Sequence, residues 1–218
     1  FGEPAIDIDR LRAWKDGVVG KLTGGLGQVS TQRGVTYLRG RAELVGPTAA
    51  RVTAPGGDTT DLQFEHAILA TGSRPASPPG LSLESDRVWD STRALEVPGV
   101  PRSLLVVGGG YIGLELGCAL RKLGSEVTVI EGLDSILAMF DAELRRPLER
   151  WLKKNGVTVH TGCTAEGAEV TDSGVDLTWN DGKDSVTERF DRVLVTVGRK
   201  ANITGWGLDE MGVKLDDS

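Results

Sequence analysis

Three glycines with a distinctive spacing are the residues of this chain best suited to chemistry. Gly108, Gly110 and Gly113 fit the spacing G-x-G-x-x-G and follow the apolar run 103–107. In such a motif the first glycine makes a tight turn, the second leaves room for a pyrophosphate, and the third lets a helix pack closely on a strand. The start of the following helix, expected over 111–123, would direct free N–H groups and the positive end of its dipole toward the phosphates. The motif predicts a dinucleotide site, although a structural glycine turn fits the same spacing in a chain with 30 glycines.

An acidic residue beyond the glycines indicates which dinucleotide is bound. Glu131 ends a second apolar run, 127–130, about 20 residues after the motif, where a carboxylate accepts hydrogen bonds from ribose hydroxyls. The same carboxylate would repel a 2′-phosphate, and the stretch 132–137 contains no Arg or Lys to bind one. The sequence therefore favours NAD(H) over NADP(H).

The cysteines and histidines give no second site. Cys118 and Cys163 lie far apart and form no C-x-x-C or metal-ligand pattern, so we expect two inert thiols, no metal and a reducing, cytoplasmic setting. His66 begins one expected strand and His160 ends another, and neither is expected to be catalytic. We assign no catalytic residue to this chain.

The nucleotide motif belongs to a region in which strands and helices alternate. Buried strands and two helices are expected in the order strand 103–107, helix 111–123, strand 127–130, helix 141–155, strand 157–159 and, later, strand 192–197. Asp141 is expected to cap the second helix, which would carry Leu144, Leu148 and Leu152 on one face and end at Gly156.

A second pattern of short strands lies within the same region. Strands expected at 168–171, 175–179 and 185–190, with a hairpin turn at 180–182, predict an antiparallel meander. The fold class is therefore α/β, a Rossmann-like domain with a parallel sheet and a β-meander. Ligands bind such domains at the carboxyl ends of the strands, where Gly198 is expected to line the nicotinamide side.

The first third of the chain has a different organisation. Apolar residues recur at helical spacing over 9–33, which predicts a packing helix with one buried face. Short strands at 34–38, 42–45, 50–53 and 61–64 would form another antiparallel meander, followed by one buried strand at 66–70. The next residues, Thr71, Gly72 and Ser73, can place N–H groups and hydroxyls against a ligand. The proline-rich segment 75–101, with a short helical turn at 92–95, is interpreted as a linker and a domain boundary.

Size and charge bound the class of protein. With 218 residues, 39% hydrophobic and 26% charged, the chain has an ordinary globular composition and room for one or two domains. Its net charge of −6 and the lack of a basic stripe argue against a nucleic-acid partner. No apolar stretch approaches the length of a membrane span, and from the first residues given we expect no signal peptide. Since the first residue is not Met, we expect a piece of a longer protein.

The glycine motif combines with other segments into a family resemblance. In chain order these segments are 70–75, 108–117, Glu131 and 197–199. Over its whole length the chain resembles the flavoprotein pyridine nucleotide-disulfide oxidoreductases, and most closely the members that oxidise dihydrolipoamide. Gly113 and Glu131 match the NAD-using members, whereas NADPH-using relatives usually carry Ala at the first position and basic residues after the second strand. The segments 22–26 and 90–95 resemble the same NAD-using members.

The resemblance implies two cofactors, FAD and NAD. Tyr111 would lie where some members have an aromatic gate over the flavin. Glu115 would lie where an acid approaches the nicotinamide, although its lysine partner would be upstream of Phe1. FAD would be contacted by Gly40, Thr71, Gly72 and Ser73. NAD would be contacted by Gly108, Gly109, Gly110, Tyr111, Ile112, Gly113, Leu114, Glu115, Glu131 and Gly198, with Ala165 near the adenine.

The resemblance also implies parts of two domains. Residues 1–92 would be part of an FAD-binding domain, 93–198 the NAD-binding domain, and 199–218 a return to the FAD-binding domain. The family's first FAD motif, its C-x-x-x-x-C redox disulfide, its later Gly-Asp motif and its interface domain are not in this chain. We therefore expect the middle of an enzyme, inactive toward lipoamide by itself. The full-length protein would be a cytoplasmic homodimer that serves the lipoyl domain of a 2-oxoacid dehydrogenase complex or the glycine cleavage system.

Two alternatives stay open. A mercuric, mycothiol or other disulfide reductase, or an NADH oxidase, would differ from the lipoamide-oxidising members in residues upstream of Phe1. A nucleotide-binding module with no redox step would be indicated if the native gene encoded only these residues.

Overall fold

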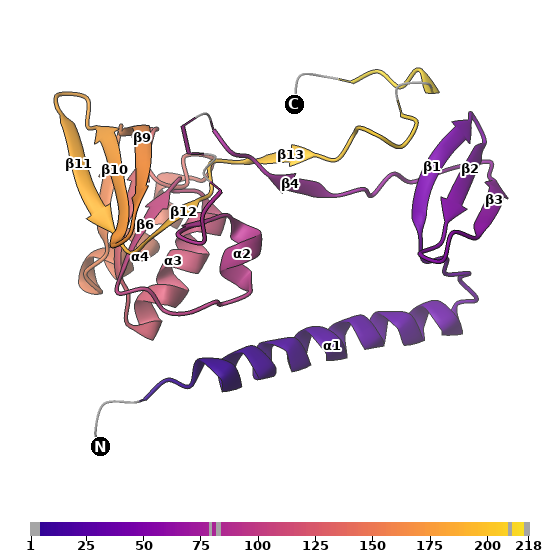
Figure 1. Cartoon of the computed structure of the whole chain (residues 1–218), viewed down its shortest axis with the longest axis horizontal. Helices are drawn as coiled ribbons and strands as arrows, with labels where there is room; N and C mark the ends of the chain where they lie inside the picture. The colour runs from indigo at the N-terminus through magenta and orange to yellow at the C-terminus, as the bar shows by residue number, and fades with distance from the viewer. Residues whose placement is uncertain (1–4, 79, 82–83, 209–210, 216–218) are drawn as a thin grey trace. The chain divides into compact units, whose positions relative to one another are not determined.

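The computed structural model describes residues 5–78, 80–81, 84–208 and 211–215 (Figure 1). The chain divides into two compact units, which we call the larger unit (Phe1–Arg12 with Pro75–Arg199) and the smaller unit (Ala13–Arg74 with Lys200–Ser218). The continuous part of the larger unit begins at Pro75.

A five-stranded parallel sheet is the centre of the larger unit. Every neighbouring pair in it is parallel. Two helices, α3 (Tyr111–Leu123) and α4 (Ala142–Lys154), connect three of its strands. The expected α/β class is confirmed. The strands lie in the order β5 (Val88–Trp89), β12 (Arg192–Val195), β6 (Ser103–Val107), β7 (Glu126–Glu131) and β8 (Thr158–Thr161).

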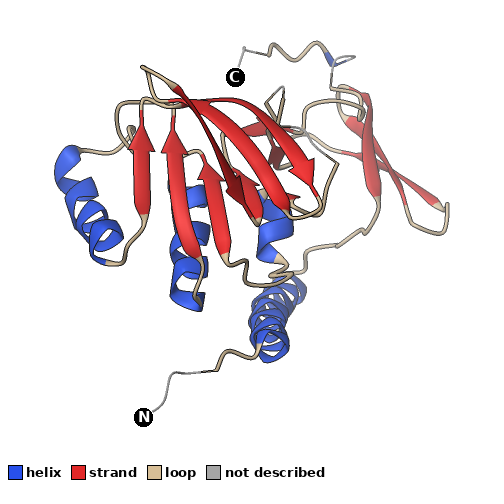
Figure 2. Cartoon of the chain, turned by 60° about the vertical axis from the view of Figure 1, so that its left-hand side comes forward, coloured by secondary structure: helices blue, strands red, loops and turns tan. Residues whose placement is uncertain are grey.

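Alternate residues of the central strands face different layers, because successive side chains of a strand point to opposite faces. Leu104 of β6 belongs to a hydrophobic cluster with Leu120 of α3. Its neighbour Leu105 belongs to a second cluster with Leu177 of β10 (Gly174–Asn180). Figure 2 shows the helices on one face of the parallel sheet and a second sheet on the other. Burial on both faces explains why these strands are unbroken apolar runs.

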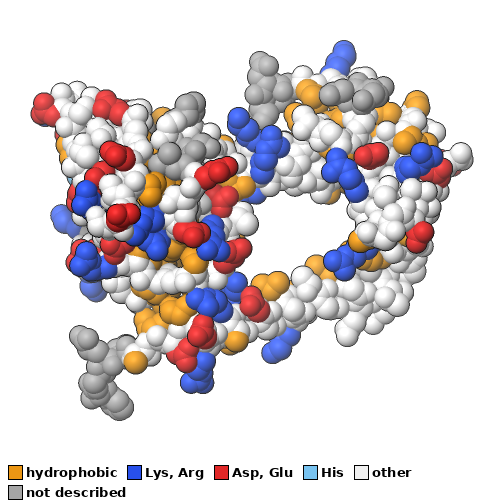
Figure 3. Space-filling model, in the orientation of Figure 1, with side chains coloured by type: hydrophobic (Ala, Val, Ile, Leu, Met, Phe, Trp, Pro, Cys, Tyr) orange, Lys and Arg blue, Asp and Glu red, His pale blue; other side chains and the backbone are white. Residues whose placement is uncertain are grey.

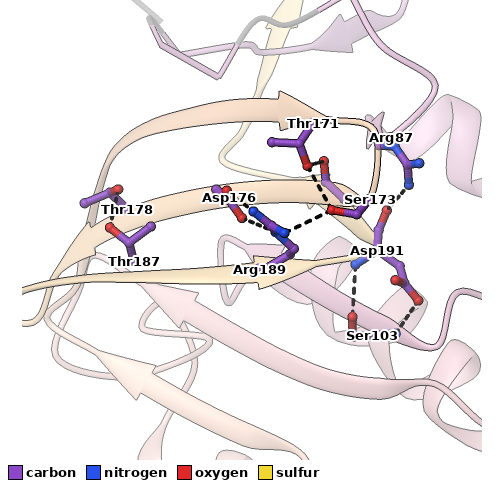
Figure 4. Close-up of polar contacts among 10 residues, drawn as sticks. Arg87, Ser103, Thr171, Ser173, Asp176, Thr178, Thr187, Arg189 and Asp191 are labelled. Atoms are coloured by element: carbon purple, nitrogen blue, oxygen red, sulfur yellow. Dashed lines mark hydrogen bonds and ion pairs between the residues drawn. The ribbon is translucent and has the colours of Figure 1, made fainter.

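The second sheet is the expected antiparallel meander of β9 (Thr164–Thr171), β10 and β11 (Ser185–Phe190). Its outward face is polar. Arg189 of β11 makes a two-pronged ion pair with Asp176 of β10, with both N–O distances at 2.6 Å (Figure 4). The hydroxyls of Thr178 and Thr187 lie opposite each other at 2.8 Å. Such cross-strand pairs support the register of the sheet.

Asp191 ties the start of β12 to the start of β6. Its Oδ2 accepts hydrogen bonds from the backbone N–H groups of Arg102 (2.9 Å) and Ser103 (3.2 Å). Its own N–H donates to Ser103 Oγ at 2.9 Å (Figure 4). These bonds help set the alignment of two parallel strands whose other ends carry Gly108 and Gly198.

The ends of α4 lie close to the expected residues, but two details differ. Asp141 is the N-cap residue and makes no capping hydrogen bond through its side chain, so the expected cap is wrong. Leu152 is buried and Leu148 is partly buried, whereas Leu144 is 67% exposed. Only the later turns of α4 therefore pack on the core, because Leu144 lies in the first turn.

The segment 75–101 is not a linker. It contributes the strand β5, which pairs with β12, and the helix α2 (Ser91–Leu95). The N-cap residue Asp90 accepts a hydrogen bond from the N–H of Arg93 at 2.8 Å. Trp89 is buried in the same cluster as Leu120. A two-residue strand among prolines is too short to show a hydrophobic period, which is why the pattern failed here.

The smaller unit contains a three-stranded antiparallel meander, as expected. Its strands are β1 (Arg41–Gly46), β2 (Ala49–Thr53) and β3 (Thr59–Gln63). The strand expected at 34–38 is not formed. The N–H of Leu44 donates to the carbonyl of Trp206 at 2.8 Å, which brings the C-terminal segment to β1. A short two-stranded sheet pairs β4 (Ser73–Pro75) with β13 (Arg199–Ala201).

Two apolar segments are exposed where burial was expected. The helix α1 (Ile8–Gln32) has the expected length but buries none of its residues, and hydrophobic side chains along it are open to solvent (Figure 3). The segment 66–70 is not a strand, and Ile68 is 95% exposed. Among the described residues no strand pairs with 66–70, so its backbone groups lack the partners that a strand needs. No helix within the described ranges is long and apolar enough to cross a membrane.

Candidate functional site

A cavity of about 740 Å³ lies at the carboxyl ends of β6, β7 and β12 in the larger unit. This is the place where ligands bind open α/β sheets. Seven residues that the sequence assigned to the NAD site line it, namely Gly108, Gly110, Tyr111, Ile112, Glu131, Ala165 and Gly198. The strands therefore bring together residues that are up to 90 positions apart in the chain, Gly108 and Gly198.

The three glycines of the motif meet three different surroundings. Gly108 has φ +107°, and a Cβ there would lie 2.6 Å from the carbonyl oxygen of Thr196. A Cβ on Gly113 would overlap the carbonyl oxygen of Gly108 and come within 2.8 Å of Val106. A Cβ on Gly110 would meet no atom within 4 Å. Packing thus requires glycine at the first and third positions, whereas at the second position the space is free for a ligand.

Glu131 closes the glycine loop onto β7. Its Oε2 accepts a hydrogen bond from the N–H of Gly109 at 2.6 Å, and its Oε1 accepts one from the N–H of Leu133 at 2.9 Å. The carboxylate is partly buried at the edge of the cavity. A carboxylate oxygen has more than one acceptor site, so both oxygens retain capacity for ribose hydroxyls.

The other four residues assigned to the NAD site do not line the cavity. Gly109 lies behind it, where a Cβ would come within 2.8 Å of Ile136. Gly113 and Leu114 are buried in the contact of α3 with the sheet. Glu115 is exposed on α3. These residues support the loop or lie beyond it.

The residues that the sequence assigned to FAD belong to the smaller unit. A Cβ on Gly40 would overlap the carbonyl oxygen of Thr53. Asn202 holds the turn at 71–73, since its Nδ2 donates to the carbonyl of Thr71 and its N–H donates to the carbonyl of Gly72, both at 3.0 Å. Gly72 has φ +71°, and Ser73 begins β4. Within the unit, Gly40 contacts β2 and the turn contacts Asn202.

Sequence reasoning missed part of the cavity wall. Pro78 and Leu81 line it from the segment that was interpreted as a linker. Thr196 and Val197 could have been found, because they are the last two residues of the expected strand 192–197. Cys163 also lines the cavity, and burial raises the pKa of its thiol, which keeps the thiol protonated. The loop after β7 contributes Gly132, Leu133, Leu137, Ala138 and Met139.

One protein family matches nearly the whole chain. The family model described as pyridine nucleotide-disulphide oxidoreductase matches residues 3–218. The dihydrolipoyl dehydrogenase of Halobacterium salinarum is 39% identical over 100% of this chain and 46% of its own length. That of Geobacillus stearothermophilus is 41% identical over 96% of this chain and 44% of its own length. The chain thus spans about half the length of the curated relatives it matches.

Solved structures have a similar fold. LpdA from Mycobacterium tuberculosis has a TM-score of 0.86 and 26% identity, with 99% of this chain and 48% of that chain covered. RclA from Escherichia coli, a HOCl-induced flavoprotein disulfide reductase, has a TM-score of 0.80 over 97% of this chain and 47% of that chain. Its identity of 23% supports a likeness of fold alone.

Proposed function

Because the chain belongs to the pyridine nucleotide-disulphide oxidoreductase family, we propose that its larger unit binds NAD(H) in the cavity beside Gly110 and that its smaller unit forms part of an FAD site. The full-length protein would be a dihydrolipoyl dehydrogenase, as its curated relatives are. Bound FAD and NAD supply the hydride transfer, and the protein holds and orients them.

The free space beside Gly110 is the observation that carries this proposal. The pyrophosphate would lie against the Gly108–Gly110 backbone at the start of α3, where free N–H groups and the helix dipole favour an anion. Glu131 would accept hydrogen bonds from the ribose of the adenosine and exclude a 2′-phosphate. Ala165 would border the adenine, and Gly198 the nicotinamide side.

Two further roles are proposed around the nicotinamide and the flavin. Tyr111 is 53% exposed at the edge of the cavity, where an aromatic ring could cover a ligand. Glu115 would act only with a partner outside this chain. Gly40 and the turn Thr71–Ser73 would approach FAD through backbone groups and hydroxyls.

The dithiol step would need groups that this sequence does not contain. Its two cysteines, Cys118 and Cys163, are both free. We therefore propose that this chain supplies the hydride-acceptor side only. The full-length enzyme would be a cytoplasmic homodimer that receives electrons from the lipoyl domain of a 2-oxoacid dehydrogenase complex or the glycine cleavage system.

A pair of glycine variants tests the NAD site. Gly110→Val would place its side chain in the free space and should abolish NADH binding in a fluorescence titration while the melting temperature stays near that of the wild type. Gly113→Val would overlap Gly108 and Val106 and should lower the melting temperature instead. Unchanged NADH affinity in a folded Gly110→Val protein would refute the proposed site.

A further inference from the structure

The loop between β7 and α4 is a wall of the cavity with an unusual backbone. Leu137 has φ +48°, one of only two positive φ values found at non-glycine residues in the described ranges. Residues other than glycine rarely adopt this backbone conformation, and it persists where surrounding contacts hold it. Since Leu137 and its neighbours Ala138 and Met139 line the cavity, the contacts that hold this loop also shape the site.

One peptide group of this loop is held from both sides. The N–H of Leu137 donates to the carbonyl of Gly109, the residue between the first two glycines of the motif, at 3.0 Å. The carbonyl of Ile136, in the same peptide plane, accepts a hydrogen bond from Nη1 of Arg145 at 3.2 Å. Arg145 lies in the first turn of α4 and does not line the cavity. A guanidinium on α4 is therefore connected to the glycine loop through a single peptide unit.

We propose that Arg145 is a positioning residue for the dinucleotide. By orienting the Ile136–Leu137 peptide, Arg145 keeps the N–H of Leu137 directed at the carbonyl of Gly109. The N–H of Gly109 in turn donates to Oε2 of Glu131 at 2.6 Å. Arg145 thus acts on both the pyrophosphate loop and the ribose acid without touching the nucleotide. This inference rests on the proposed NAD(H) site.

The surroundings of Arg145 argue against a role in packing alone. Its Nε is buried and has no hydrogen-bond partner among the described residues. A buried donor without a partner is unfavourable, so an apolar side chain of similar reach would remove that cost. Arg145 should therefore contribute more to the conformation of the loop between β7 and α4 than to the free energy of unfolding.

Three variants separate these roles. Arg145→Leu removes the donor to Ile136, and Arg145→Lys retains a donor of similar reach. Arg146→Leu, at an exposed arginine next along α4, is the matched control for charge and helix propensity. For each protein, the complete chain is used to measure the melting temperature, the exchange rate of the Leu137 amide by NMR without nucleotide, and the Kd for NADH.

The proposal gives a specific pattern. In Arg145→Leu the Leu137 amide should exchange about fivefold faster, and NADH should bind about tenfold more weakly, with little change in melting temperature. In Arg145→Lys the Leu137 exchange rate and the affinity for NADH should both be close to those of the wild type. In Arg146→Leu both should equal the wild-type values. Unchanged exchange at Leu137 in Arg145→Leu, or equal weakening of NADH in Arg146→Leu, would overturn the inference. If the wild-type chain itself fails to bind NADH, the proposed function fails, and the exchange rate of Leu137 alone decides the role of Arg145.

Discussion

At Gly108, Gly110 and Gly113, one residue type meets three different physical demands. The spacing alone predicted a turn, a free approach and a close helix contact, and the surroundings of the three positions agree with those roles. The spacing could not show which hydrogen bonds hold the glycine loop in place. The contacts of Leu137 and Arg145 with this loop join residues 109, 136–137 and 145, and no periodic pattern marks such a junction.

Glu131 would have two tasks at the residue scale, because its carboxylate accepts hydrogen bonds from two backbone N–H groups and is also proposed to bind the ribose. Glu131→Arg should therefore remove the preference for NADH over NADPH, since the 2′-phosphate would meet a cation instead of an anion. The expected change in the ratio of the two Kd values is about tenfold or more, the size of one charge-assisted hydrogen bond. Paired fluorescence titrations measure that ratio.

Asp134→Arg is the control for this change of charge. Asp134 is exposed three residues farther along and does not line the cavity. If Asp134→Arg shifts the preference as much as Glu131→Arg does, the effect comes from net charge and not from contact with the ribose.

At the scale of elements, long regular patterns were reliable and short irregular ones were not. The strands β6, β7 and β12 were recognisable because burial on both faces makes them continuous apolar runs. The strand β5 was missed because two residues are too few to show an alternation of apolar and polar residues. The segment 66–70 has the composition of a buried strand, but composition cannot supply a neighbour for its N–H and C=O groups.

The alignment of β6 with β12 should depend on Asp191. Asp191→Ala removes the acceptor of two backbone N–H groups, and the free energy of unfolding should fall by about 1–3 kcal/mol. Urea denaturation measures this change.

Asp176→Ala provides the comparison for the Asp191 variant. It breaks an ion pair on the outer face of the meander, where solvent screens the charges, and should cost much less. Equal losses in the two variants would contradict the tie between the strands.

At the scale of the whole molecule, the chain spans about half the length of the curated relatives it matches. The exposed faces of α1 and of 66–70 show why burial could not be predicted there. A periodic pattern of apolar residues predicts that one face of an element tends to be buried. It does not identify the surface that buries that face.

The proposal that this chain does not contain the redox disulfide leads to a prediction for the chain as a whole. The purified chain, supplemented with FAD and NAD⁺, should not oxidise dihydrolipoamide, because neither Cys118 nor Cys163 has a thiol partner. Formation of NADH at 340 nm measures this. Turnover above a no-protein control would show that this chain contains more of the dithiol machinery than we propose.

The central claim, an NAD(H) site between Gly110 and Glu131, is tested most directly by titrating the wild-type chain with NADH and NADPH side by side while nucleotide fluorescence is followed. We predict saturable binding of NADH and at least about tenfold weaker binding of NADPH, the difference expected when a carboxylate faces a 2′-phosphate. Equal affinities would show that Glu131 does not contact the ribose. Binding of neither nucleotide by the folded chain would contradict the assignment of the cavity itself.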